Sequence, residues 1–302
     1  MIKHNSHQSK LSFEFFPPKE GSAEALEDTA KQLKCMHPEY FSITCGAGGS
    51  KPWGTLATAL SLRASTQIDT VPHLSCIGTT KEKIRLLLKQ FQQNGIRRLV
   101  ALRGDLSDHH SQAHSDFQYA RDLVSFIREE TGEYFFIYVA AYPEFHPDVN
   151  NVKTDLQYFK NKIDAGANAA ITQYFFNVDA YFRFVDNCSK LGIAVPIIPG
   201  IMPIFSYQKL VHFSELCGAE IPRWLRLRLE NHANDNEAMQ AFGCDVTTEL
   251  CTKLLLGGAS GLHFYTINKL EPTRAICRNL SIAGWHTSNQ KREDEKQKTV
   301  NV

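Results

Sequence analysis

The sequence has no long apolar run and no excess of charge of either sign. Its 302 residues carry 33 basic and 32 acidic side chains, for a formal net charge of +1. A nucleic-acid-binding domain would be expected to be strongly basic, and a membrane-spanning helix needs about 20 consecutive apolar residues. The polar start, MIKHNSHQSK, lacks the apolar core of a secretory signal. We therefore expect a cytoplasmic protein without nucleic-acid or membrane partners.

Several common functional motifs are also absent. The eight cysteines are scattered and form no C-x-x-C pair, so free thiols are expected rather than a disulfide framework. The chain has no Walker A motif, no H-E-x-x-H and no G-x-S-x-G. Residues 107–116 (SDHHSQAHSD) place His110 and His114 four positions apart, but the segment is polar throughout. A solvated loop is the better interpretation, and we expect no metal site.

Short runs rich in β-branched and aromatic residues alternate with helix-like segments. This alternation is typical of repeated βα units and a parallel sheet. The helix-like segments include 22–36, 80–93 with Thr80 as the expected N-cap, 153–165 and 178–190. The eight strand-like runs are 11–16, 40–46, 71–78, 97–104, 135–143, 169–176, 195–201 and 261–268.

Eight βα units in about 280 residues predict a (β/α)8 TIM barrel. An open doubly wound sheet would carry a G-x-G-x-x-G turn after its first strand, and none is present. Residues 217–257 are long for one connection, which predicts extra helices between strands seven and eight. Within them, IPRWLRLRLE is expected to form a partly buried helix or turn, or else a phosphate or membrane patch. We expect residues 1–285 to form one catalytic barrel domain and the polar tail 286–302 to be disordered.

Nearly every predicted strand carries a polar side chain near its carboxyl end, where barrel enzymes place their active sites. Each of these groups also has a structural alternative, such as a buried histidine that is simply hydrogen-bonded or an arginine and an aspartate that pair across a turn. Convergence on one end of one barrel favours a binding site for a large polar ligand. The groups at these positions are Glu14, Thr44, His73, Arg103, Asp105, Tyr142, Glu144, His146, Gln173, Tyr265 and Asn268.

Glu14 poses a particular question, because it lies between two phenylalanines in LSFEFFPP (11–18). A buried carboxylate is costly unless it is paired or protonated. From sequence alone, Glu14 either pairs with a partner such as Arg103 or is held as an acid.

Seven motifs occur in order along the chain and resemble the methylenetetrahydrofolate reductase family in its short bacterial form, which consists of the catalytic domain alone. Any one of them is weak, but seven at the expected strand ends are specific. They are FEFFPPK (13–19), PHLSCIG (72–78), ALRGD (101–105), AAYPEFHP (140–147), DAGANAAITQYFF (164–176), PIIPGIMP (196–203) and HFYTIN (263–268).

The resemblance implies a flavin enzyme that works by a ping-pong mechanism. FAD would bind at the carboxyl end of the barrel and be reduced by NADH or NADPH. The substrate 5,10-methylenetetrahydrofolate would then take the place of the nicotinamide and leave as 5-methyltetrahydrofolate, which supplies methionine synthesis. Bacterial members form homo-oligomers, so the same is expected here. The alternatives are another flavin-dependent barrel oxidoreductase, of the proline dehydrogenase type, and a barrel that binds ligand without catalysis.

The resemblance also implies roles for individual residues. Glu14 falls on the family's general acid, which donates a proton to N10 of the folate, and the apolar setting of FEFF would favour its protonated form. Asp105 falls on the aspartate beside flavin and pterin, while Gln173, Phe213 and Lys269 fall on folate-binding positions. The FAD-lining positions are Thr44, His73, Arg103, Gly104, Asp105, Tyr119, Ala120, Tyr142, His146, Asp155 and Lys162.

Three departures from the family pattern concern ligand binding. Cys45 stands where a tyrosine is common, and Asn161 stands where a basic residue often precedes the lysine. Lys269 replaces an arginine, so it would bind the folate glutamate carboxylate as a point charge and not through two parallel hydrogen bonds.

Overall fold

The structure is a computed structural model that describes residues 10–45, 52–104, 115–147, 151–232 and 235–282. The polar tail, 286–302, lies outside these residues, and the single-domain assignment of 1–285 stays a prediction.

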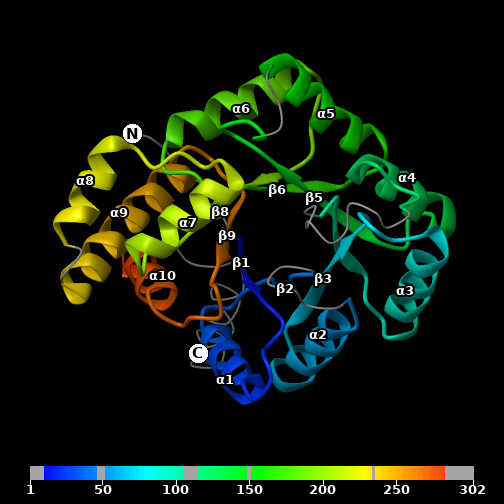
Figure 1. Ribbon diagram of the computed structural model, residues 1–302, viewed down its shortest axis with the longest axis horizontal. Helices are drawn as coiled ribbons and strands as arrows, with labels where there is room; N and C mark the ends of the chain where they lie inside the picture. The colour runs from blue at the N-terminus through cyan, green and yellow to red at the C-terminus, as the bar shows by residue number, and fades with distance from the viewer. Residues whose placement is uncertain (1–9, 46–51, 105–114, 148–150, 233–234, 283–302) are drawn as a thin grey trace, which may run out of the picture.

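The strands of the described residues form one parallel sheet that curves into a barrel (Figure 1). Their order in the sheet is β7-β6-β5-β4-β3-β2-β1-β9-β8. The strands are β1 (Lys10–Phe15), β2 (Tyr40–Ile43), β3 (Asp69–Ser75), β4 (Arg98–Leu102), β5 (Phe136–Ala141), β6 (Ala169–Thr172), β7 (Ile197–Ile198), β8 (Gly200–Ile201) and β9 (Gly261–Tyr265).

The seventh predicted strand is divided into two at Pro199. Ile197–Ile198 pairs with β6, whereas Gly200–Ile201 pairs with β9. In the register of β8 and β9, the N–H of residue 199 would point toward β9, and proline has none, so pairing with β9 begins only at Gly200. Residues 197–201 therefore close the barrel between β6 and β9, and the TIM-barrel prediction is confirmed with one interrupted strand.

Helices surround the barrel (Figure 1). Those in the described residues are α1 (Ala23–Lys34), α2 (Pro52–Thr66), α3 (Lys81–Gln93), α4 (Ala120–Thr131), α5 (Val152–Asp164), α6 (Val178–Lys190), α7 (Tyr207–Cys217), α8 (Arg223–Asn231), α9 (Asn236–Leu256) and α10 (Thr273–Ile282). The predicted cap of α3 is present, because Thr80 accepts a hydrogen bond from the N–H of Lys83.

Alternate side chains along the strands pack into two different hydrophobic cores, one between the strands and the helices and one inside the barrel. Phe13, Phe15 and Phe264 are fully buried in the layer between the strands and the helices. Tyr40 and Tyr138 belong to a separate cluster that fills the barrel interior. This is the expected result of side chains alternating between the two faces of a strand.

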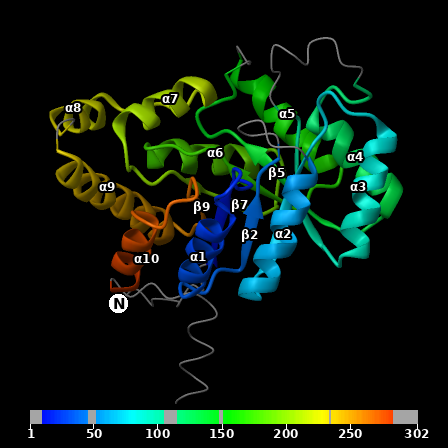
Figure 2. The ribbon, with the colours of Figure 1, turned by 60° about the horizontal axis from the view of Figure 1, so that its bottom comes forward.

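The predicted extra helices lie between β8 and β9. Figure 2 shows α7 and α8 above α9 and α10, toward one end of the barrel. The IPRWLRLRLE segment forms α8, as the helical interpretation required. Leu225 and Leu229 of α8 are buried, whereas Trp224 and Leu227 are exposed.

Candidate functional site

Glu14 points into the barrel interior and meets two histidines. Its Oε2 atom lies 3.4 Å from His263 Nε2 and 3.4 Å from His73 Nε2. Its other oxygen, Oε1, has no hydrogen-bond partner among the described residues. The partner suggested from sequence, Arg103, makes no ion pair with it in the described part of the chain.

The phenylalanines beside Glu14 in the sequence do not surround its carboxyl group. Phe13 and Phe15 pack outward against Phe41, with ring centroids 6.3 and 5.3 Å from that ring. Strand alternation turns Glu14 to the opposite face. The expected apolar setting of FEFF is therefore wrong for the carboxyl group, whose neighbours are imidazoles.

His263 lies beside Glu14 in this candidate site but is not among the residues predicted from the sequence. It is fully buried, and its Nδ1 atom lies 2.8 Å from Ser12 Oγ, within hydrogen-bond reach. The sequence does indicate this position, because His263 precedes Tyr265 by two positions on one strand and side chains two apart share a face.

His73 lies on β3, 7% exposed. Its Nε2 atom is close to Glu14 but is not aligned for a hydrogen bond, so it has no hydrogen-bond partner in the described structure. Burial lowers the pKa of His73 from 6.5 to about 4; Glu14 opposes this shift and His263 adds to it. The ring is therefore neutral at neutral pH.

Two predicted FAD-lining positions follow β2 and β4. Thr44 is buried, and its Oγ1 atom has no hydrogen-bond partner among the described groups. Gly104 has φ of +87°, and a Cβ there would fall 2.0 Å from Ser75 Oγ. The Arg103 carbonyl accepts a hydrogen bond from that same serine hydroxyl, at 2.9 Å. Only glycine fits this approach of the two strand ends.

A second group of predicted FAD-lining residues lies around β5 and α5. Lys162 donates to the carbonyl of Ala140 at 2.6 Å, and burial lowers its pKa to about 8, opposed by Asp155. Asp155 accepts from the His146 N–H at 3.3 Å. The rings of Tyr142 and His146 lie 4.6 Å apart. The arrangement brings a cation, a carboxylate and two rings to the end of one strand.

Tyr119 and Ala120 lie at the amino end of α4. Tyr119 is the N-cap residue, 46% exposed, and its N–H donates to Asp122 at 2.9 Å. Ala120 is the first residue of the helix.

Asp105 lies outside the described residues, as do His110 and His114. Among the residues that the structure describes, no group of three histidine, cysteine or acidic side chains is arranged to hold a metal.

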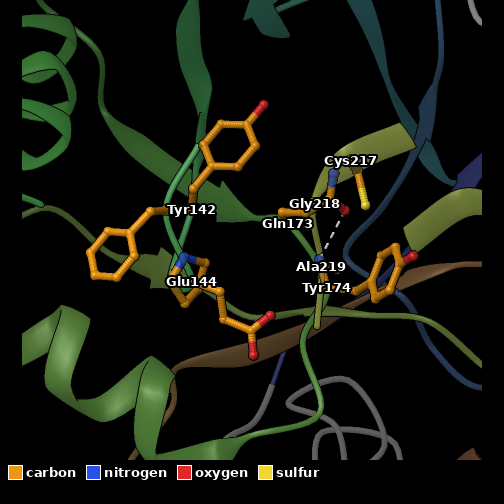
Figure 3. Close-up of a pocket in the computed structure, with 9 residues that line it drawn as sticks. Tyr142, Glu144, Gln173, Tyr174, Cys217, Gly218 and Ala219 are labelled. Atoms are coloured by element: carbon orange, nitrogen blue, oxygen red, sulfur yellow. Dashed lines mark hydrogen bonds between the residues drawn. The ribbon is translucent and has the colours of Figure 1, made fainter. Parts of the chain in front are cut away.

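A small pocket lies beside the carboxyl ends of β5 and β6 (Figure 3). Gln173 lines it, and its side-chain oxygen accepts from the N–H of Tyr174 at 3.0 Å. Glu144 also lines it and accepts from the Glu220 N–H at 2.9 Å, and burial raises the pKa of this carboxyl. Cys217 contributes a thiol, whose pKa is also raised by burial.

The remaining predicted folate-binding residues lie on elements near β9 and on α7. Phe213 of α7 is half-buried against the cluster that contains Tyr174. Lys269 is exposed just after β9. Asn268 is predicted from the sequence to face a ligand, but its side chain binds the backbone of Phe16 instead. It accepts a hydrogen bond from the Phe16 N–H at 2.9 Å and donates one to the Phe16 carbonyl at 3.0 Å.

Within the described part of the chain, no helix has both the length and the apolar character to cross a membrane.

The sequence matches the family model described as methylenetetrahydrofolate reductase over residues 1–281. It is 38% identical to the 5,10-methylenetetrahydrofolate reductase of Salmonella typhimurium, covering 91% of this chain and 92% of that protein. It is 39% identical to methylenetetrahydrofolate reductase (NADH) 1 of Arabidopsis thaliana, covering 91% of this chain but only 49% of that longer protein.

Among solved structures, one similar fold belongs to a Clostridium thermocellum protein described as binding two copies of 5-methyl-5,6,7,8-tetrahydrofolic acid. The TM-score is 0.67 at 16% identity, covering 92% of this chain and 97% of that one, which shows a shared fold. The family match and the identity over nearly the whole length of a curated relative decide the assignment: the chain belongs to the methylenetetrahydrofolate reductase family and is an oxidoreductase.

Proposed function

We propose that this enzyme reduces 5,10-methylenetetrahydrofolate to 5-methyltetrahydrofolate by a ping-pong mechanism, with bound FAD and with NADH or NADPH as electron donor. Family membership supports the reaction, and the site around Glu14 supports the mechanism. The observation that carries the proposal is the Glu14 carboxyl in the barrel interior, with one oxygen between two histidines and the other without a partner among the described residues.

Glu14 would act as the general acid. The five-membered ring of the substrate opens when its N10–methylene bond breaks and N10 takes a proton, which leaves a 5-iminium cation that can accept hydride. The Oε1 atom of Glu14 is the oxygen available to carry that proton. His263 would fix the carboxyl, because it is held in turn by Ser12.

The described residues fit an FAD. Among the residues that the structure describes, the buried atoms Thr44 Oγ1 and His73 Nε2 have no hydrogen-bond partner. A buried polar atom without a partner costs free energy that a ligand group can recover. Gly104 lets the ends of β3 and β4 approach closely beside Ser75, which a residue with a Cβ could not do. Lys162 would meet the pyrophosphate, with Asp155 beside it. When bound, FAD supplies the group that accepts hydride from the nicotinamide and passes it to the folate.

Gln173 and Phe213 would bind the pterin part of the folate, and Lys269 its glutamate carboxylate. Asp105 would lie beside flavin and pterin. Gln173 lines the pocket of Figure 3, and the exposed Lys269 suits a charged ligand tail.

The test is anaerobic and separates the two half-reactions. The yellow flavin should bleach with NADH and recover its colour with methylenetetrahydrofolate. The Glu14→Gln variant should keep the first step and lose the second, because only folate reduction needs the proton. Full folate reduction by Glu14→Gln would refute the role of the acid. Flavin bleaching without folate reoxidation in the wild type would instead favour a flavin oxidoreductase of the proline dehydrogenase type.

We also propose a cytoplasmic homo-oligomer. All eight cysteines are free, as suits a reducing compartment. The exposed Trp224 and Leu227 on α8 offer apolar surface for contact between copies. Light scattering on a size-exclusion column tests the assembly, and a monomer would refute it.

A further inference from the structure

The junction between β6 and β7 leaves one backbone carbonyl without its ladder partner. The register pairs Ile171 with Ile198, so the next parallel ladder bond would run from the Gly200 N–H to the Thr172 carbonyl. Instead, the Gly200 N–H donates to the side-chain hydroxyl of Thr172 at 2.9 Å, because Gly200 has moved on to pair with β9.

Tyr265 supplies the missing donor from β9, on the other side of the interrupted strand. Its hydroxyl donates to the Thr172 carbonyl at 2.7 Å. Gly200 makes room for this contact, because a Cβ there would lie 2.1 Å from the Thr172 carbonyl and 2.6 Å from the Tyr265 ring. A tyrosine side chain thus completes the pairing at the place where the barrel closes.

The same side chain connects the strand pair that carries Glu14 with the residue before Gln173. On β9, Tyr265 is the register partner of Glu14 on β1, so the two side chains share the interior face. Its hydroxyl reaches the carbonyl of the residue immediately before Gln173. The backbone of Gln173 is anchored on its other side, since its N–H donates to the Ala141 carbonyl at 2.7 Å.

We propose that Tyr265 is a positioning residue, which fixes the Gln173 amide relative to the Glu14 carboxyl across the mouth of the barrel. The inference rests on the proposed function, in which Gln173 binds the pterin and Glu14 protonates N10. The predicted FAD contacts lie mainly on β2 to β5 and α5, on the other side of the interior. Reduction of the flavin by NADH needs neither the pterin contact nor the proton on N10, so we expect it not to depend on the Tyr265 hydroxyl.

The test compares Tyr265→Phe with Tyr181→Phe. Tyr181 of α6 is a matched control, because its buried hydroxyl donates to the Ile197 carbonyl at 2.8 Å near the same junction but outside the interior. We expect Tyr265→Phe to raise KM for methylenetetrahydrofolate about tenfold, equivalent to about 1.4 kcal/mol. The rate of anaerobic flavin reduction by NADH should be unchanged, and Tyr181→Phe should leave both quantities at wild-type values.

Several results would overturn the inference. An unchanged KM in Tyr265→Phe would do so, and so would an equal slowing of both half-reactions, since either result denies a specific role at the folate site. Gly200→Ala is the second variant, and we expect the same selective rise in KM. If Tyr265→Phe and Gly200→Ala fail to fold while Tyr181→Phe folds, the contact is structural rather than positional.

The failure of the proposed function is distinguishable from these outcomes. In that case the wild-type protein itself would not reoxidise its flavin with methylenetetrahydrofolate, and the inference would fall with it.

Discussion

Acidification should destabilise this protein through His73. The ring is buried in the barrel interior, and burial lowers its pKa to about 4 from the ordinary value of 6.5. Between these two values the unfolded chain binds a proton that the folded protein does not. Stability from the neutral ring is therefore fully present above pH 6.5 and declines as the pH falls toward 4.

The size of the effect follows from the two pKa values. The difference between 6.5 and about 4, at about 1.36 kcal/mol per pH unit, corresponds to about 3 kcal/mol. A loss of this size is a large part of the stability of an ordinary domain. It should appear as a fall in the free energy of unfolding between pH 7 and pH 4.

Urea unfolding at a series of pH values measures this fall in the free energy of unfolding, and His73→Gln is the test variant. This variant should lose about 3 kcal/mol less than the wild type over the same range. His212→Gln, at an exposed position on α7, is the control and should follow the wild type. Glu14→Gln should steepen the fall, because the Glu14 carboxylate raises the pKa of His73. Parallel profiles for His73→Gln and the wild type would refute the reasoning.

Three further predictions concern other positions. Gly104→Ala should cost about 1–3 kcal/mol more in urea unfolding than Gly95→Ala, because both glycines have positive φ but only the first would clash with Ser75; equal losses would contradict the clash. Asn268→Ala should cost about 2 kcal/mol, since it removes two hydrogen bonds to the backbone after β1; a loss below about 0.5 kcal/mol would show that water replaces them. Burial raises the pKa of Cys277 to about 12, so its thiol should resist a thiol reagent at pH 8 until the protein unfolds; rapid labelling of the folded protein would contradict this.

The strands and helices could largely be predicted because their signals are local. The pattern of residues 178–190 predicts a helix, and α6 spans Val178–Lys190. The run 195–201 predicts one strand, but its two halves pair with different neighbours on either side of Pro199, which no local pattern indicates. The run 169–176 predicts a strand over its whole length, but β6 ends at Thr172, which leaves Gln173 in the loop that lines the pocket.

The sequence by itself determined the alternation of strands and helices, the position of Glu14 on the first strand and, through its ordered motifs, the family. Only the tertiary structure decided what surrounds that carboxyl group. Phe13 and Phe15 are its neighbours in the chain yet face away, whereas His263 is 249 positions distant and touches it. Periodicity is encoded by nearby residues, but the contact between Glu14 and His263 depends on the register that β1 and β9 adopt when the barrel closes.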